Sequence, residues 1–403
     1  MSLQETPTAN RLHIAIFGRR NTGKSSLINA ITNQPIALVS DIAGTTTDPV
    51  YKNMEVNGLG ACTLIDTAGF DDSGELGLLR IGKTKEALQK TDIAIVLFDD
   101  AALQAQDFTY EKEWVAQIKN HQVPIVAVVN KSDQMTDEQI EALRQIIKKE
   151  FDLDALSVSA QTSQGIDALI AALIRSCPED FEAKSITAHL ISAGDMVLLV
   201  MPQDIQAPRG RLILPQVQTI RDLLDNKCLV LSVTTDRLQQ ALDSLKEPPK
   251  LIITDSQVFA KVYAMKPLQS MLTSFSALFA GHKGDIKEFV QGAQAIDTLR
   301  DGTRILIAEA CTHKPLDGDI GRQQIPALLR KYTGAELAID VVPGNAFPAD
   351  LSPYALVIHC GACMFNRKYM TNRIAAAKAQ AVPITNYGIA LAKMNGILEH
   401  ITY

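Results

Sequence analysis

Five residues of the types that bind transition metals lie in two short stretches of the chain. Cys311 and His313 belong to the motif Cys-Thr-His, and His359, Cys360 and Cys363 belong to the motif His-Cys-Gly-Ala-Cys. Thiolates at Cys-x-x-Cys spacing suit a zinc ion, an iron–sulfur cluster or a redox-active disulfide, because two side chains so close in sequence reach the same ion or each other. The cysteine pair alone does not choose among these three.

The third cysteine and the two histidines distinguish the alternatives further. A structural zinc site requires four protein ligands, which the three cysteines and one histidine would provide. A redox pair normally lies at the start of a helix and would need neither Cys311 nor the histidines. An iron–sulfur cluster takes three thiolates. A histidine, a water molecule or a carboxylate from elsewhere in the chain can complete its fourth position or leave it again. Spacing favours the cluster, with structural zinc as the main alternative.

A phosphate-binding motif lies near the start of the chain. Residues 18–25 follow the pattern G-x-x-x-x-G-K-S, after an apolar stretch at 12–17 and before a helical pattern at 26–31. In such a loop the backbone N–H groups face the phosphates, the lysine bridges the outer phosphates and the serine hydroxyl binds Mg²⁺. We therefore expect a nucleotide to contact Gly18, Asn21, Thr22, Gly23, Lys24, Ser25 and Ser26.

Two further motifs follow in the order that a nucleotide switch requires. Thr46 lies in the loop Gly-Thr-Thr-Thr-Asp, where a threonine reaches Mg²⁺ and the γ-phosphate. Asp66 and Gly69 lie in Asp-Thr-Ala-Gly after a second apolar run; we expect Asp66 in the outer shell of Mg²⁺ and the Gly69 N–H at the γ-phosphate. The predicted catalytic residues are thus Lys24, Thr46, Asp66 and Gly69.

The next motif selects the base. Asn130, Lys131 and Asp133 form Asn-Lys-Ser-Asp after an apolar run at 125–129. A carboxylate here accepts two N–H bonds from the edge of guanine, which adenine cannot supply. Ser159 and Ala160 offer backbone contacts to the same base. Together the motifs predict GTP rather than ATP.

With these motifs, residues 10–175 resemble a GTPase domain of the TrmE/Era kind. In that group the residue after Asp-Thr-Ala-Gly is hydrophobic, and here it is Phe70, so no side chain there orients the attacking water. The resemblance implies slow hydrolysis. Asn21 matches the asparagine that, in potassium-activated members, helps to hold K⁺ where an arginine finger would otherwise stand, so the resemblance also implies K⁺ activation.

Composition restricts the possible partners. The 403 residues are 46% hydrophobic and 21% charged, with a net charge of −6 and no long basic run, so we expect neither nucleic-acid nor membrane binding. The N-terminus does not resemble a signal peptide, and no apolar run approaches the ~18 residues of a membrane span. We expect a cytoplasmic protein whose cysteines are thiols or ligands.

The periodicity predicts three consecutive α/β units, at residues 1–177, 185–262 and 265–403. From the motifs and the sheet edges we interpret them as a P-loop GTPase domain, a small parallel βαβ dimerisation domain and an α/β cluster-binding domain. Strands are expected at 196–201, 228–233 and 251–254 in the second unit, and at 304–308, 337–342 and 355–358 in the third. Between these groups, residues 265–299 are expected to be largely helical. The small second sheet leaves open edges, which pairing with another subunit would cover.

The combination of a TrmE/Era-like GTPase domain, two further α/β units and the pattern C-x-H…H-C-x-x-C resembles the [FeFe]-hydrogenase maturation GTPases, the HydF family. The resemblance covers essentially the whole chain. It implies that Cys311, Cys360 and Cys363 hold a [4Fe-4S] cluster with one labile coordination position, and that the central unit forms the homodimer or a higher homo-oligomer.

The resemblance also implies a function. The family acts as a scaffold and carrier that receives a diiron precursor made with two radical-SAM maturases and passes it to [FeFe]-hydrogenase. The fourth ligand is left open among His313, His359, an acidic residue such as Asp195, and solvent. The alternative function is a GTPase switch with a structural zinc site that acts in protein binding, RNA modification or ribosome assembly. The expected cofactors are GTP, Mg²⁺, K⁺ and the [4Fe-4S] cluster.

Overall fold

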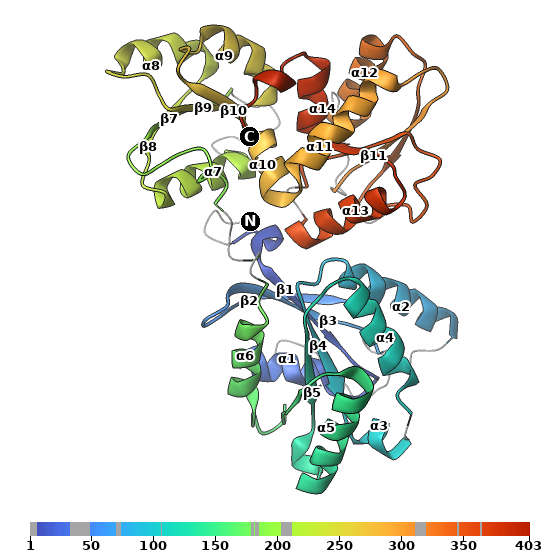
Figure 1. The fold of residues 1–403 in the computed structure, drawn as a ribbon. Helices are drawn as coiled ribbons and strands as arrows, with labels where there is room; N and C mark the ends of the chain where they lie inside the picture. The colour runs from blue at the N-terminus through green and yellow to red at the C-terminus, as the bar shows by residue number, and fades with distance from the viewer. Residues whose placement is uncertain are drawn as a thin grey trace. The chain divides into compact units, whose positions relative to one another are not determined.

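The computed structural model describes residues 6–32, 49–69, 74–105, 107–178, 181, 185–202, 212–310, 320–344, 346–362 and 365–403. Thr46, Phe70, Cys311, His313 and Cys363 lie outside the described residues. The chain forms two compact units, Met1–Ala183 and Lys184–Tyr403, and each is described by itself. Both are α/β (Figure 1), as the periodicity predicted.

A six-stranded sheet forms the centre of the first unit. Its order is β2-β3-β1-β4-β5-β6, and every neighbouring pair is parallel except β2 with β3. Its strands are β1 (Leu12–Phe17), β2 (Val50–Val56), β3 (Gly60–Asp66), β4 (Ile93–Phe98), β5 (Ile125–Val129) and β6 (Ala155–Ser157). β1 and β4 are buried at every position, as expected of strands covered on both faces, and both match their predicted ranges.

Helices cover both faces of this sheet. Apolar residues of α1 (Lys24–Thr32) and α6 (Ile166–Arg175) pack on one face. The opposite face is covered by α2 (Gly74–Leu88), α3 (Asp100–Ala105), α4 (Thr109–Asn120) and α5 (Asp137–Phe151). In this arrangement the loops that follow β1, β3, β4 and β5 leave the same edge of the sheet, where ligands of parallel α/β sheets bind.

The second unit begins with a four-stranded parallel sheet of order β10-β9-β7-β8. Its strands are β7 (Met196–Val200), β8 (Leu229–Val233), β9 (Leu251–Thr254) and β10 (Met271–Ser274), and its helices are α7 (Leu214–Asp225), α8 (Leu238–Ser244) and α9 (Phe259–Met265). The expectation of largely helical structure across residues 265–299 was wrong at β10. The segment Met-Leu-Thr-Ser runs directly into α10 with no residue between them, so the pattern does not separate it from the helix, and the pairing of β10 with β9 decides the conformation.

Another four-stranded parallel sheet follows, of order β12-β11-β13-β14. Its strands are β11 (Arg304–Ala308), β12 (Ala338–Val342), β13 (Leu356–His359) and β14 (Ile384–Asn386). The helices are α10 (Phe275–Lys283), α11 (Ile286–Ala293), α12 (Ile325–Thr333), preceded by a π-helical turn at Ile320–Gln324, α13 (Arg367–Ala379) and α14 (Tyr387–Met394).

The two sheets of the second unit share one hydrophobic core. A single buried cluster runs from Leu198 and Ile252 of the first sheet to Ile307 and Ile358 of the second. Helix α10 contacts both α7 and α14, and Figure 1 shows it between the sheets. This shared packing explains why residues 184–403 form one compact unit. The expected limits of a dimerisation domain and a cluster-binding domain stay predictions.

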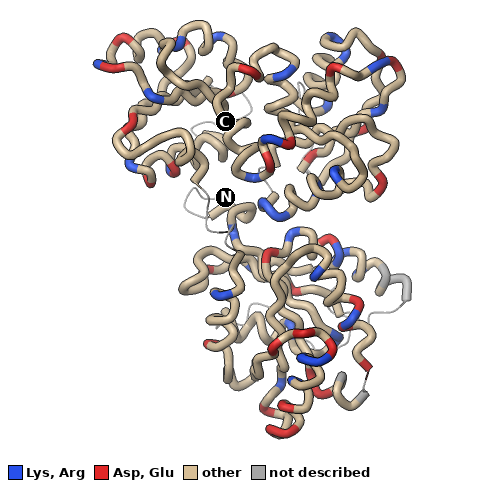
Figure 2. The backbone as a smooth tube through the Cα atoms, viewed as in Figure 1, with Lys and Arg blue, Asp and Glu red and all other residues tan. Residues whose placement is uncertain are grey.

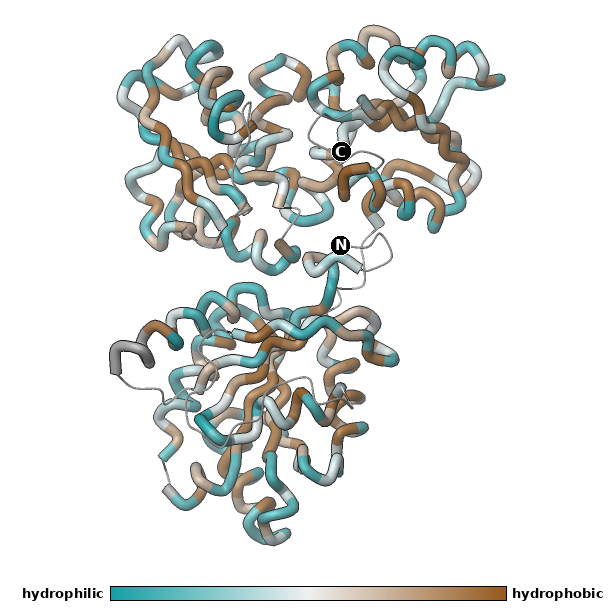
Figure 3. Tube along the Cα trace, turned by 180° about the vertical axis from the view of Figure 1, so that it is seen from behind, coloured by the Kyte–Doolittle hydropathy of each residue, from teal (hydrophilic) through white to brown (hydrophobic). Residues whose placement is uncertain are grey.

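The surface of each unit is of mixed charge. Figure 2 shows basic and acidic residues interspersed along both units, and Figure 3 shows hydrophobic residues concentrated in the strands. No helix among the described residues is long and apolar enough to cross a bilayer.

Candidate functional site

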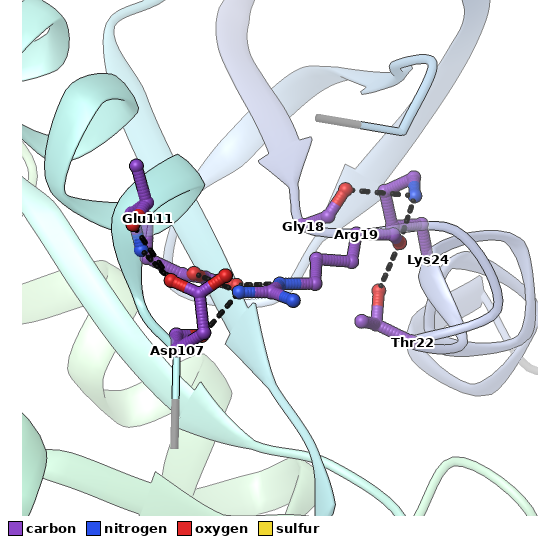
Figure 4. Close-up of polar contacts among 7 residues, drawn as sticks. Gly18, Arg19, Thr22, Lys24, Asp107 and Glu111 are labelled. Atoms are coloured by element: carbon purple, nitrogen blue, oxygen red, sulfur yellow. Dashed lines mark hydrogen bonds and ion pairs between the residues drawn. The ribbon is translucent and has the colours of Figure 1, made fainter. Parts of the chain in front are cut away.

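The phosphate-binding motif forms the turn between β1 and α1. Asn21 and Gly23 have φ angles of 61° and 91°, so the backbone is left-handed at both positions, as a loop that points its N–H groups inward requires. Lys24 is buried, and its Nζ donates to the carbonyl oxygens of Gly18 at 3.1 Å and Arg19 at 2.7 Å (Figure 4). Two carbonyl groups of its own loop therefore hold the ammonium, and its contact with the phosphates stays a prediction.

Ser25 and Asp66 meet at the start of α1 and the end of β3. The Ser25 hydroxyl donates to Asp66 Oδ2 at 2.6 Å. The other carboxylate oxygen, Oδ1, is buried and has no hydrogen-bond partner among the described residues. Burial raises the pKa of Asp66, against the effects of the Ser25 hydrogen bond and the Lys24 charge. A hydroxyl beside a carboxylate with a spare oxygen suits Mg²⁺, which prefers hard oxygen ligands.

Asn130 joins three of the predicted motifs. Its Nδ2 donates to the carbonyl oxygen of Thr22 at 2.7 Å, and its Oδ1 accepts from the backbone N–H of Ala160 at 3.3 Å. A Cβ added to Gly23 would lie 2.4 Å from Asn130 Nδ2, so only glycine fits there. The phosphate loop and the two base-recognition segments are thus fixed to one another by a single buried amide.

The remaining base-recognition residues surround this amide. Lys131 donates from Nζ to Asp99 Oδ2 at 3.0 Å and has a left-handed φ of 58°. Asp133 is exposed, whereas Ser159 is fully buried and accepts from the backbone of Thr162. Their contacts with guanine stay a prediction.

Arg19 is a residue of the phosphate loop that sequence reasoning missed. Its side chain points away from Lys24 and reaches α4 (Figure 4), where Nε and Nη2 bind the two carboxylate oxygens of Glu111 at 2.6 Å and 2.9 Å. Nη2 also donates to the backbone oxygen of Asp107, and the guanidinium lies 5.4 Å from the centre of the Tyr110 ring. Glu111 is 92 positions away, so no local pattern identifies the pair.

This ion pair gives a testable prediction. The Glu111 side chain is 1% exposed and that of Arg19 15% exposed, so the substitution Arg19→Ala leaves a buried carboxylate unpaired. We expect it to lower the free energy of unfolding of the first unit by about 3 kcal/mol. Denaturant titration followed by the fluorescence of Trp114, the chain's single tryptophan and also on α4, measures the change.

The matched control is Lys112→Ala on the same helix. Its ion pair with Glu150 is exposed and contributes little. Equal unfolding midpoints for the two variants would contradict the role assigned to Arg19.

The metal-binding motifs follow two adjacent strands of the second unit. β11 and β13 are paired in parallel with Ala308 opposite His359, so both chains leave the sheet at the same edge. The backbone N–H of Ala310 donates to Cys360 Sγ at 2.9 Å, although 50 residues separate them. Ala310 directly precedes Cys311 in the chain, so the residue before one motif lies beside the first cysteine of the other.

His359 lies at the end of β13 and is fully buried. Its Nδ1 lies 2.8 Å from the Cys360 carbonyl oxygen, and its Nε2 lies 2.5 Å from Nη1 of Arg373. Because a guanidinium has only donors, Nε2 accepts and Nδ1–H donates, which occupies both ring nitrogens. Burial, reinforced by the Arg373 charge, lowers the pKa of His359 to about 3.

The described residues do not contain a complete metal site. No group of three histidine, cysteine or carboxylate residues suited to a metal occurs among them, and three of the five candidate ligands, Cys311, His313 and Cys363, are outside them. Asp195 immediately precedes β7, on the other sheet, and its carboxylate accepts from the backbone of Ser192 at 2.8 Å. The ligand assignment therefore stays a prediction.

Two other cysteines have packing roles. Cys62 and Cys228 are buried beside apolar residues. Burial raises the pKa of Cys62 to about 12 and also raises that of Cys228. Neutral thiols of this kind are inert.

Comparison with known proteins identifies the first unit. Residues 13–131 match the family described as 50S ribosome-binding GTPase. A tRNA modification GTPase MnmE of Prochlorococcus marinus (strain NATL1A) is 35% identical over 168 residues, 41% of this chain and 34% of that protein. The mitochondrial tRNA modification GTPase MSS1 of Saccharomyces cerevisiae is 28% identical over 209 residues, 50% of this chain and 39% of that protein. The chain thus spans about a third of the length of the curated relatives that it matches.

A solved structure, that of a variant of Aquifex aeolicus Era bound to GDP.AlF4-, has 19% identity and a TM-score of 0.37, over 55% of this chain and 92% of that chain. The second unit gives two consecutive family matches. Residues 186–284 match the hydrogen maturase F dimerization domain, and residues 287–402 match the hydrogen maturase F tetramerization domain. With a TrmE/Era-like GTPase domain followed by both of these domains, the chain belongs to the hydrogen maturase F (HydF) family.

Proposed function

We propose that this chain is a cytoplasmic GTP-hydrolysing scaffold that binds a [4Fe-4S] cluster through Cys311, Cys360 and Cys363. In this role it assembles the diiron precursor with two radical-SAM maturases and delivers it to [FeFe]-hydrogenase. The observation that carries the proposal is the contact between the Ala310 N–H and Cys360 Sγ. It supports one shared site for the two cysteine motifs in a member of the hydrogen maturase F family.

The chain's own residues fit this role. Cys360 and Ala310, the residue before Cys311, lie at the carboxyl ends of neighbouring parallel strands, where α/β sheets form their sites. The Ala310 N–H stabilises a thiolate at Cys360, as a donor to a ligand sulfur does. A cluster held by three thiolates leaves one iron able to take an exogenous ligand, and so to accept an iron unit and release it.

The nucleotide site fits GTP hydrolysis. We assign the outer phosphates to Lys24, the Mg²⁺ ion to Ser25 with Asp66 and Thr46, the γ-phosphate to the Gly69 N–H, and guanine to Asp133. Asp66 has the spare oxygen that this assignment requires. We expect the first unit to act as a switch between a GTP-bound and a GDP-bound state, because loops that contact the γ-phosphate are ordered while it is bound and become disordered when it leaves.

Metal analysis tests the proposal. The full-length chain is reconstituted anaerobically with iron and sulfide, and iron, acid-labile sulfide and zinc are then counted per chain. We expect iron and sulfide in equal amounts and absorption at about 400 nm, and then activation of [FeFe]-hydrogenase that lacks only its diiron subcluster by chain that was co-expressed with the maturases. Zinc alone, without that absorption, would favour a GTPase switch with a structural zinc site.

Potassium activation is a separate prediction. Asn21 is exposed in the phosphate loop, where a bound K⁺ would place positive charge near the transferring phosphoryl group. We expect GTP turnover to be at least about tenfold faster in KCl than in NaCl at equal ionic strength, on the scale of one lost transition-state contact. Asn21→Gly keeps the left-handed backbone and should remove the difference; equal rates in both salts with the unaltered chain would exclude the effect.

Oligomerisation gives a further prediction. β8 is an edge strand, and Leu229 on it is 58% exposed; Leu224 of α7 is 56% exposed. An apolar open edge is normally covered, here by a second copy of the chain. We expect Leu229→Asp to reduce the molar mass from light scattering by at least about half, because a charge at the edge opposes strand pairing.

The control for this prediction is Leu79→Asp. Leu79 lies on α2 of the first unit and is 68% exposed, so the change in chemistry and exposure is comparable. We expect its mass to match that of the unaltered chain. Unchanged mass for Leu229→Asp would place the interface elsewhere.

A further inference from the structure

Arg373, on α13, carries a buried positive charge. The residue is 3% exposed. Nη2 donates to the Gly344 carbonyl oxygen at 2.6 Å and to the Tyr369 hydroxyl at 3.0 Å, and Nη1 donates to His359 Nε2 at 2.5 Å. All three acceptors are neutral. Buried charges are normally paired, so this set of partners leaves the charge without compensation.

Arg373 has no counter-ion among the described residues. No carboxylate there pairs with Arg373, and its Nε is buried without a hydrogen-bond partner there. Three aromatic rings surround the guanidinium, with Cζ 4.6 Å from the ring centre of Phe347, 4.9 Å from Phe365 and 4.6 Å from Tyr369. The rings attract a cation and exclude water, but they do not neutralise its charge.

The position of the Arg373 guanidinium indicates which anion could balance its charge. Arg373 holds the ring of His359, the residue before Cys360, and His359 in turn contacts the Cys360 carbonyl oxygen. An iron–sulfur cluster with three thiolate ligands is a net anion, and one-electron reduction increases its negative charge. Cys360 interacts electrostatically with Arg373, so the Cys360 thiolate and the group that it would hold are candidates for the balancing negative charge.

We propose that Arg373 is a positioning residue of the cluster site, whose buried charge balances the negative charge of the cluster and stabilises its reduced form. The inference rests on the proposed cluster binding. Charge near a cluster sets its reduction potential. A nearby positive charge favours the more negative, reduced state and raises the potential, so its loss makes the potential more negative.

Redox titration of reconstituted full-length chain, followed by EPR, tests the assignment. We expect Arg373→Gln to make the midpoint potential more negative and to weaken cluster retention by about 10- to 100-fold, as loss of supporting contacts does at metal sites. Arg373→Lys keeps the charge and should stay closer to the unaltered chain. The matched control is Arg304→Gln at the other end of β11, where the arginine is half-exposed and paired with Asp340; it should leave the potential unchanged.

A second pair of variants keeps Arg373 in place. Phe347 is half-buried beside the guanidinium, so Phe347→Glu adds a carboxylate that neutralises the charge, and Phe347→Gln is the neutral control. We expect a more negative potential for Phe347→Glu than for Phe347→Gln. Equal potentials for these two would overturn the inference even if Arg373→Gln does not fold.

The outcomes separate this inference from the proposed function. If the unaltered chain holds no iron and sulfide, the proposed function fails. If it holds both and Arg373→Gln, shown to be folded by circular dichroism, has the unaltered potential, only the role of Arg373 fails. Parallel negative shifts in Arg373→Gln and Phe347→Glu support it.

Discussion

Lys24→Ala is expected to lower kcat for GTP hydrolysis by about 10²- to 10³-fold, the effect of removing one preorganised donor from a developing negative charge. In this structure the ammonium is buried and held by two carbonyl oxygens of its own loop. It is therefore already in place when phosphates arrive, and no other described lysine lies in the phosphate loop, residues 18–25. Phosphate release at saturating GTP, with MgCl₂ and KCl, measures the loss.

The control for this substitution is Lys148→Ala. Lys148 is an exposed residue of α5 that pairs with Asp152 and Asp154. Its removal should leave kcat unchanged. A Lys24→Ala variant with normal turnover would show that hydrolysis does not use this loop, whereas loss of GTP affinity without loss of kcat would restrict Lys24 to ground-state binding.

Cys360→Ala is expected to abolish cluster binding. The substitution removes the sulfur that accepts from Ala310 and one of only three proposed thiolate ligands, and a cluster cannot be held firmly by two. Iron and sulfide per chain after anaerobic reconstitution should fall to the level of a preparation without added iron. GTP turnover should be unchanged, because the phosphate loop lies in the other unit.

Cys228→Ala is the matched control for the cluster. This thiol is buried in the core of the sheet formed by β7–β10, and burial raises its pKa. We expect full iron and sulfide in this variant. Equal iron in Cys360→Ala and the unaltered chain would remove Cys360 from the ligand set and with it the proposed shared site.

Much of the fold was predictable because its signals are local. β1, β4, β5 and β11 match the expected strand ranges, since apolar runs of four to six residues such as those they contain are typical of buried parallel strands. The short strand β10 was missed because it continues directly into the apolar helix α10, so the pattern gives no boundary between strand and helix. Its conformation depends on pairing with β9, from which the helix α9 separates it in the chain.

The sequence by itself determined the phosphate loop, the order of the nucleotide motifs and the two cysteine motifs, because each depends on residue types at fixed short spacing. Only the tertiary structure decided which distant residues support them. Glu111 binds Arg19, Asn130 joins the phosphate loop to Ala160, and Arg373 holds His359. These contacts form where strand ends and helix faces meet in space. A sequence pattern gives the spacing of residues along the chain and not the distance between residues that are far apart in it.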